Sequence, residues 1–373
     1  MVHPLIDKCS KAAGIAVLSL TMLSSCIKDD LDSCPSQVRL KFDYTYNVKD
    51  ADAFSAEVKN LNVYVFDKDG KYYDTYVESA QKFDTGHTMN INNLPSDGKY
   101  TFVCLARNKQ YDTSRADDDD EMEFTFTQLT PGVSTMDDLQ EEMGKKGLTG
   151  GFTNNKNFTA LYTAKTTVDY KEGQTSESEL SLMKCTKTYR VILMPQEKNQ
   201  EGFDLDNFDV KIDGSAALLN CEGNKVENKA ITYEPYSSET RTNTGDYIKE
   251  DQQTIDKALV YDLASSRMFE RKNDTSSATR TGTEYDDKRI IITDKRNGKE
   301  LFNHSLPWFL ALCGEHTETE DGVEWGDQEY LDRQDHYALV FYVPAATSTS
   351  DYKINAKIQV NGWVLNLQDA DLK

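Results

Sequence analysis

The residues of this sequence best suited to hold a metal ion are acidic, and they gather in two short segments. One is the run Asp67-Lys68-Asp69-Gly70, and the other extends from Asp117 to Glu121. Calcium prefers carboxylate oxygens, but a calcium loop also needs a defined spacing and a bidentate glutamate. The first segment lacks that glutamate, and the second has no defined spacing. We therefore expect no dedicated metal site, and at most adventitious calcium on the acidic run.

The sequence carries no catalytic motif. It contains no H-E-x-x-H, no G-x-S-x-G and no P-loop. The glycine-rich stretch at residues 144–151 lacks the strand-turn-helix context that phosphate binding needs. Four histidines stand without recognisable partners: His87, His304, His316 and His336. We predict a protein that is not an enzyme and uses no cofactor. A lipid-anchored hydrolase is a further hypothesis. Its active site would be a pair of carboxylates from distant positions, and among 63 acidic residues such a pair cannot be recognised from spacing alone.

Tryptophan side chains offer another kind of recognition, because flat aromatic faces stack on the CH groups of sugars. The chain has three tryptophans, at positions 308, 325 and 363. Trp363 fits a core-facing strand position. Trp325 lies in a polar stretch and is the candidate for an exposed sugar-binding side chain.

Cys26 carries the clearest chemistry in the sequence. An apolar run at residues 12–23 precedes it, long enough for the core of a signal peptide and too short for a bilayer span, which needs about 20 residues. The run ends in Leu23-Ser24-Ser25-Cys26, which resembles the bacterial lipobox. In a lipobox the cysteine sulfur takes a diacylglycerol, the preceding peptide bond is cut and the new amine is acylated.

We therefore expect residues 1–25 to be a lipoprotein signal peptide and residues 26–35 to be a lipidated acidic tether. Each buried CH₂ contributes about 0.8 kcal/mol to membrane binding, so three acyl chains make a durable anchor where one chain binds marginally. Lys28, Asp29 and Asp30 resemble the signal that exports lipoproteins to the outer face of the outer membrane. The predicted location is the outer membrane, lipid-anchored and facing outward.

Composition excludes several partners. The chain has 373 residues, a net charge of −21 and a pI near 4.7. Such an acidic protein lacks the clustered Lys and Arg that nucleic acid requires. It is also repelled by an anionic bilayer, so the lipid must hold it there. With 38% hydrophobic residues, the chain can bury a core rather than form a disordered stalk.

Cysteine spacing indicates neither a zinc site nor a defined disulfide framework. Five cysteines follow Cys26, and none forms a C-x-x-C pair: Cys34, Cys104, Cys185, Cys221 and Cys313. Cys104 lies in an apolar strand pattern, which favours a buried free thiol.

Alternating apolar and polar residues dominate the first third of the chain and predict half-buried strands. From Val38 to Asn47 the even-numbered residues are mostly apolar and the odd-numbered ones polar. The strand Leu61–Phe66 leads into the Asp67–Gly70 turn, whose Asp-Gly pair is typical of a tight hairpin. Another strand follows at residues 100–106. With no helices between the strands, the sheets should be antiparallel.

Residues 107–160 break this pattern and predict a long polar insertion. One short helix is expected at Ser134–Met143, because Ser134 and Asp137 are spaced as in a capping box and Gly144 follows. A second polar stretch, residues 237–286, predicts surface loops around a short strand at 258–262.

The second half of the chain returns to strand patterns, with candidates at residues 209–212, 290–293, 337–343 and 352–360. Asn361-Gly362 predicts a hairpin that returns through Trp363–Leu367. The length suits two domains. We expect an N-terminal sandwich over residues 36–178 and a C-terminal sandwich over residues 179–373, with the boundary near 178–186.

Together with the lipobox, several segments resemble the fimbrillin-associated anchor subunits of Bacteroides-type fimbriae. They are residues 26–35, 38–47, 61–70, 98–103 and 360–364. The resemblance covers most of the chain after the signal peptide. It implies an all-β fold of two transthyretin-like antiparallel β-sandwich domains with long polar loop insertions. It also implies a non-catalytic subunit that anchors a fimbrium at the outer membrane and limits its length.

The resemblance further implies fimbrillin and other fimbrial subunits as partners, joined by addition of a strand from one chain to the sheet of the next. A surface glycan-binding lipoprotein of a nutrient-uptake system is the alternative, because such proteins share the anchor, the acidic tether and β-sandwiches. The sequence leaves open which strand is given or received, and whether the subunit sits at the anchor, at the tip or elsewhere.

Overall fold

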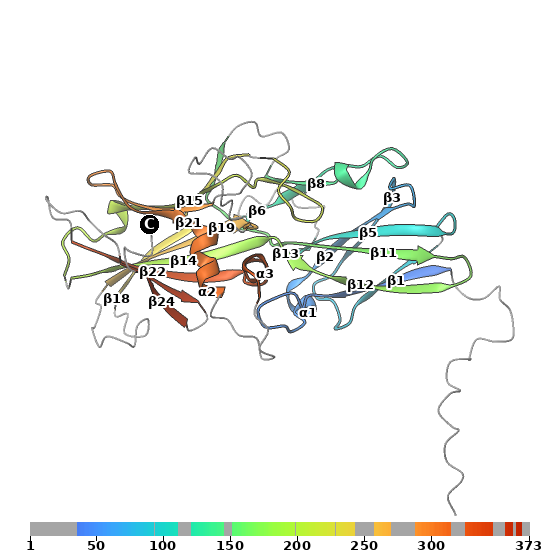
Figure 1. Ribbon diagram of the computed structural model, residues 1–373, viewed down its shortest axis with the longest axis horizontal. Coiled ribbons are helices and arrows are strands. Elements are labelled where there is room, and N and C mark those ends of the chain that lie inside the picture. Colours follow the sequence, from blue (N-terminus) through green and yellow to red (C-terminus); the bar gives the residue numbers. More distant parts are fainter. Residues whose placement is uncertain are drawn as a thin grey trace, which may run out of the picture.

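The computed structural model places most of the chain in two β-sandwiches arranged end to end along the long axis of the molecule (Figure 1). It describes residues 36–92, 94–110, 121–144, 151–197, 199–227, 229–242, 257–269, 288–314, 325–345, 355–360 and 363–367. Within these residues no helix is long and apolar enough to cross a membrane.

The N-terminal sandwich packs a three-stranded sheet against a five-stranded one, with the short helix α1 (Phe54–Glu57) at one end. The first sheet has the order β12 (Thr175–Ser181), β1 (Gln37–Asp43) and β4 (Thr88–Asn92). The second has the order β13 (Met183–Lys184), β11 (Leu161–Tyr170), β5 (Gly98–Arg107), β2 (Asn60–Phe66) and β3 (Tyr72–Ser79).

The alternation predicted for the first strand is confirmed in β1. Val38, Leu40 and Phe42 are fully buried in the core between the two sheets. Arg39 and Lys41 point the other way and form ion pairs with side chains of β12. Period-two patterning works here because one face of the sheet meets the core and the other meets water.

The predicted hairpin is also confirmed between β2 and β3. Gly70 has φ +71°, which a side chain would disfavour. The Asp67 carboxylate accepts hydrogen bonds from the backbone N–H groups of Asp69 and Lys71, at 2.9 and 2.8 Å. Asp67 is therefore part of the turn, as expected.

The C-terminal sandwich is larger. Its first sheet has the order β18 (Ser237–Thr242), β19 (Lys257–Ser266), β14 (Thr186–Pro195), β22 (His336–Val343), β23 (Asn355–Val360) and β24 (Trp363–Leu367). Its second has the order β21 (Lys299–Ser305), β20 (Arg289–Asp294), β15 (Phe208–Gly214), β17 (Ile231–Tyr233) and β9 (Phe152–Asn154). A 3₁₀ turn at Leu205–Asn207 and the helices α2 (Leu306–Gly314) and α3 (Asp327–Arg333) complete it.

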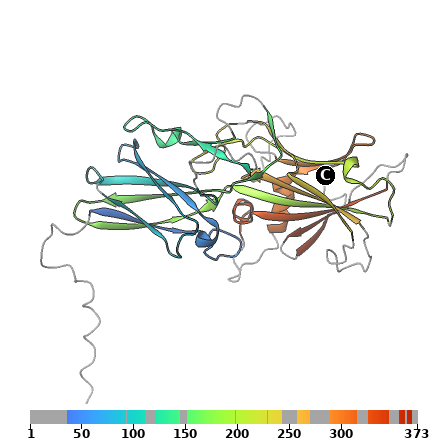
Figure 2. The same cartoon turned by 180° about the vertical axis from the view of Figure 1, so that it is seen from behind.

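The expected polar insertion at 107–160 instead contains strands that tie the two sandwiches together. Figure 2 shows this segment lying across the top of both. Its strands are β6 (Glu121–Met122), β7 (Phe124–Phe126), β8 (Gln140–Met143), β9 and β10 (Asn157–Phe158). β8 pairs with β16 (Leu218–Asn220) from the second half of the chain, and β9 forms an edge of a C-terminal sheet.

The predicted helix at Ser134–Met143 is wrong. A 3₁₀ turn covers only Met136–Asp138, and its capping box uses Thr135 and Asp138, one residue later than expected. The chain then enters β8, whose residues alternate between half-buried and buried. Pairing with β7 on one side and β16 on the other outweighs the local capping signal.

The all-β prediction is confirmed, but the sheets are mixed rather than purely antiparallel. β1 runs parallel to β12, and β14 runs parallel to β22. A transthyretin-like topology stays a prediction. The expected division between residues 178 and 179 falls inside β12, which pairs with β1 along its whole length. The chain moves from the N-terminal sheets to the C-terminal ones between Lys184 and Thr186.

Candidate anchoring and assembly elements

The predicted lipid attachment site lies outside the described residues, as do the residues beside it: Leu23, Ser24, Ser25, Cys26, Lys28, Asp29 and Asp30. The structure instead shows what the tether leads into. Gln37, the first residue of β1, follows Cys26 by eleven positions.

β1 occupies the centre of its sheet. It pairs with β12 over all seven residues from Gln37 to Asp43, and with β4 from Gln37 to Lys41. Ion pairs reinforce the contact with β12, at 2.6 Å between Arg39 and Glu177 and at 2.7 Å between Lys41 and Glu179. The segment that follows the tether is thus fixed on both sides.

The opposite end of the described chain forms a sheet edge. β24 closes the six-stranded sheet and pairs only with β23 in that sheet. Its sequence, Trp-Val-Leu-Asn-Leu, contains no charged residue. Charged side chains protect exposed sheet edges from pairing with other chains. β24 lacks that protection.

The other outermost strands of the described sheets differ from β24. Among those of five residues or more, β3, β12, β18 and β21 all carry charged residues. β4 is uncharged, but Arg39 Nε reaches its Asn90 side chain at 3.4 Å. β24 is therefore the apolar edge best suited to accept or supply a strand.

Two groups of charged and aromatic side chains hold the sandwiches together. The amine of Lys184 lies 2.9 Å from Glu57 of α1 and 2.6 Å from Asp335, which precedes β22. Burial opposes the charged amine, but the two carboxylates outweigh it and raise the pKa of Lys184. The pKa of Asp335 is lowered: burial opposes this, and the nearby amine of Lys184 outweighs the burial.

Arg333 of α3 forms the second group. Its guanidinium lies 4.3 Å from the ring centre of Tyr46 and 4.9 Å from that of Trp325. It also contacts the Asp50 carboxylate at 2.7 Å. Trp325 is half-buried, packs against the core of the C-terminal sandwich and has Arg333 over one face of its ring, so it is part of the joint between the sandwiches.

The other candidate residues have structural partners or lie outside the described residues. His87 contacts Glu78 at 2.7 Å, His336 contacts Thr188 at 2.9 Å, and His304 packs on Phe302. His316 and residues 117–120 fall outside, and no group of three potential metal ligands occurs among the residues that are described. Cys104 is free and buried, as expected, as are Cys185 and Cys221.

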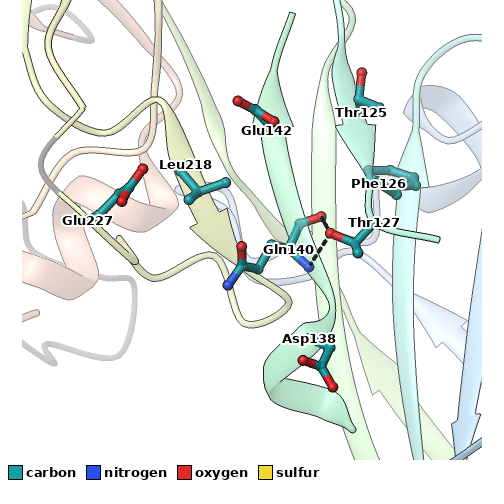
Figure 3. Close-up of a pocket in the computed structure, with 8 residues that line it drawn as sticks. All are labelled: Thr125, Phe126, Thr127, Asp138, Gln140, Glu142, Leu218 and Glu227. Atoms are coloured by element: carbon teal, nitrogen blue, oxygen red, sulfur yellow. Dashed lines mark hydrogen bonds between the residues drawn. The ribbon is translucent and has the colours of Figure 1, made fainter. Parts of the chain in front are cut away.

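A shallow polar cavity of about 420 Å³ opens beside β7, β8 and β16 (Figure 3). Its lining includes hydroxyl, amide and carboxylate groups: Thr125, Thr127, Asp138, Gln140, Glu142 and Glu227. Glu142 is paired with Lys229, and Asp138 accepts hydrogen bonds from Thr135. These contacts give the carboxylates structural partners and do not form a catalytic pair.

Sequence reasoning missed the residues of the joint. Lys184 and Arg333 stand in no motif, and their partners Glu57 and Asp50 are more than 100 positions away. The available signal was a basic residue near each of two predicted strands, which is too common to single out.

The fold has relatives among solved structures. A Bacteroides thetaiotaomicron protein described as a candidate polysaccharide-binding protein is 25% identical, with a TM-score of 0.65, covering 90% of this chain and 99% of its own. A candidate adhesin from Bacteroides ovatus is 24% identical, with a TM-score of 0.67, covering 90% and 96%. The fimbrial anchor protein Mfa2 from Porphyromonas gingivalis is 18% identical, with a TM-score of 0.59, covering 89% and 99%.

No match was found among curated proteins. The family model of the fimbrillin-A associated anchor proteins Mfa1 and Mfa2, however, matches residues 31–369. That span includes β1, the joint and β24. The chain therefore belongs to the family of fimbrillin-A associated anchor proteins, a non-enzymatic family of the bacterial cell envelope.

Proposed function

We propose that this protein fixes the base of a fimbrium to the outer membrane. The lipid on Cys26 holds the N-terminal end, and the edge at β24 joins a fimbrillin subunit by strand addition. The observation that carries the proposal is the difference between the two ends: β1, which follows the tether, is enclosed between two strands, whereas β24 is an uncharged edge.

Strand addition needs backbone N–H and C=O groups that face outward along a strand. The outer side of β24 offers them along one edge of the C-terminal sandwich, away from the sandwich that contains β1. β1 offers none, because β12 and β4 occupy both of its sides. A subunit with one enclosed, lipid-bound end can be extended in one direction only, which is what the base of a polymer requires.

The lipid anchor is tested by fractionating cells that produce the full chain or its Cys26→Ala variant. We expect the full chain in the outer membrane and the variant in soluble fractions. Replacing Lys28, Asp29 and Asp30 with alanine should leave the protein in the membrane but protect it from protease added to intact cells. Membrane retention of Cys26→Ala would contradict lipidation.

The assembly step is tested by mixing residues 27–373 with fimbrillin subunits encoded in the same genomic neighbourhood. An SDS-resistant complex on unheated gels, lost after boiling, supports strand addition. Absence of any complex with every neighbouring fimbrillin would overturn it.

The glycan-binding alternative has two supporting observations. They are the polar cavity beside β8 and the description of one solved relative as a candidate polysaccharide-binding protein. Against it, the predicted sugar-binding ring of Trp325 is half-buried and has Arg333 over one face. A polysaccharide panel therefore serves as the counter-test. Binding that is lost in Gln140→Ala, without any fimbrillin complex, would favour the alternative.

A further inference from the structure

The two longest parallel strand pairs, β1–β12 and β14–β22, lie in line between the tether and the far end of the molecule. We infer that β1, β12, β14 and β22 form a load path that carries tension along the long axis, with each parallel pair loaded in shear. This inference rests on the proposed anchoring role, because that role places one pull at the tether and the other on the six-stranded sheet that contains β14, β22 and β24.

The direction of β1 is fixed by its contacts. The N-terminal end of β1 lies at the outer end of the molecule (Figure 1). There the Oγ of Ser36, the residue before β1, accepts a hydrogen bond from the Gly173 N–H at 2.7 Å. Its last residue, Asp43, lies near the joint, because its carbonyl accepts a hydrogen bond from Leu182 N–H at 2.9 Å. A pull on the tether therefore acts on the outer end of β1 and along its axis.

β12 takes up this load on the way to the second sandwich. It runs parallel to β1 over all seven residue pairs and leaves the sheet at the joint. One strand is thus pulled at its N-terminal end and its neighbour at its C-terminal end. In that geometry the hydrogen bonds between them bear the load together, and no bond at the end of the strand is opened first.

Four residues connect β12 to β14, and the joint holds them firmly. The Cys185 N–H donates to the Leu161 carbonyl at 2.7 Å, and Lys184 is paired with Glu57 and Asp335. Cys185 is fully buried. The load therefore passes from β12 into β14 through the backbone, without a free hinge.

The second sandwich repeats the arrangement. β14 begins at the joint and runs parallel to β22 over eight residue pairs, from Thr188 and His336 to Pro195 and Val343. The pull again acts on the N-terminal end of one strand and the C-terminal end of the other. Both parallel pairs therefore lie along the same axis and are loaded in the same sense.

Single-molecule force measurements on residues 27–373 test the load path. Native Cys34 provides one handle, and Ala345→Cys, two residues beyond β22, provides the second, in a chain carrying Cys313→Ser. The matched control keeps the Cys34 handle and moves the other to Asn92, which pairs with Gln37. That control peels β1 from β4 one pair at a time.

We expect the axial geometry to rupture at a higher force than the peeling geometry at the same loading rate. Replacing Glu177 and Glu179 with lysine sets like charges opposite Arg39 and Lys41. It should lower the axial force and leave the peeling force unchanged, while circular dichroism checks that the variant folds. Axial rupture at an equal or lower force than peeling would overturn the inference.

These measurements use neither a membrane nor a fimbrillin. Failure of the anchor or of the SDS-resistant complex would therefore leave the mechanical result standing. Conversely, a low axial force would overturn the load path without affecting the proposed assembly.

Discussion

The two sandwiches share one plan and differ at one edge. In one sheet of each, an inner strand lies between an antiparallel neighbour and a parallel one: β1 between β4 and β12, and β14 between β19 and β22. In the N-terminal sandwich the parallel neighbour β12 is the edge of the sheet. In the C-terminal sandwich the sheet continues past β22 into the β23–β24 hairpin.

The two edges have opposite chemistry. β12 carries Glu177 and Glu179, which are paired with β1 and are more than half exposed. β24 carries no charge. The same plan therefore yields a charged edge beside the strand that follows the predicted tether, and an uncharged edge where we propose that assembly occurs. The C-terminal hairpin, added to a shared core arrangement, makes the difference between the two ends.

The largest effect is expected when β24 receives charged residues like those of β12, because this removes the difference between the two edges. Val364→Lys together with Asn366→Lys places two charges on this edge. We expect loss of the SDS-resistant fimbrillin complex, because charged residues on an edge strand oppose pairing. The matched control, Ser178→Lys on β12, should assemble normally. Normal assembly of the β24 variant, with its fold verified by circular dichroism, would contradict the proposed role of this edge.

The next largest effect is a loss of stability on breaking a buried ion pair in the C-terminal sandwich. The described residues of the N-terminal sandwich contain no such pair. Arg267 contacts Asp332 of α3 through two hydrogen bonds of 2.7 Å, and the two residues are 7% and 3% exposed. Arg267→Ala leaves the carboxylate without its cation, which costs about 3–5 kcal/mol in a buried pair. Urea unfolding measures this loss. A loss below about 1 kcal/mol, which is typical of an exposed ion pair, would show that this buried pair contributes no more than an exposed one.

Glu141 is a fully buried acidic residue in β8, one of the strands that bridge the two sandwiches. Both carboxylate oxygens are buried without a hydrogen-bond partner, and burial raises the pKa of this group well above 4.5. Above pH 4.5 the unfolded chain loses this proton while the folded chain keeps it, so this group's contribution to stability falls as the pH rises.

Glu141→Gln removes that penalty. We expect the variant to gain stability over the parent as the pH rises from 4.5 to 7.5, by about 1.4 kcal/mol for each pH unit over which the folded chain keeps the proton and the unfolded chain has lost it. The measurement is the free energy of unfolding of the variant and of the parent, compared at several pH values between 4.5 and 7.5. A gain that stays constant with pH would contradict a protonated Glu141.

The smallest effect is expected at the exposed pair that joins β1 to β12. Arg39 is 42% and Glu177 is 65% exposed at the side chain. Arg39→Ala should therefore cost only about 0–1 kcal/mol in urea unfolding. A cost comparable to that of Arg267→Ala would remove the distinction between the exposed and the buried pairs.

Strands with one face in the core and the other in solvent were predictable from the sequence. Segments whose structure depends on pairing with residues distant in the sequence were not. β1 and the β2–β3 hairpin carry their own signals, in alternation and in an Asp-Gly turn. The strands predicted at 209–212, 258–262, 290–293 and 337–343 are found within β15, β19, β20 and β22. β8 was predicted as part of a helix, because its capping residues are local while its partners in β7 and β16 are distant.

The anchor and the assembly edge differ in the same way. The lipobox is a contiguous motif, so lipidation of Cys26 could be predicted from the sequence, and it stays a prediction. The role of β24 depends on its place in a six-stranded sheet and on the charges of the other edges. Neither feature can be seen in the five residues of β24 alone.

Hydrogen exchange of residues 27–373, with and without the fimbrillin partner, tests the central claim most directly. Among the described strands, none pairs with the outward N–H groups of β24, and strand addition would occupy them. We predict that the partner slows exchange in residues 363–367 and leaves exchange in residues 175–181 unchanged. A complex that protects β12, or that forms without protecting β24, would contradict the account.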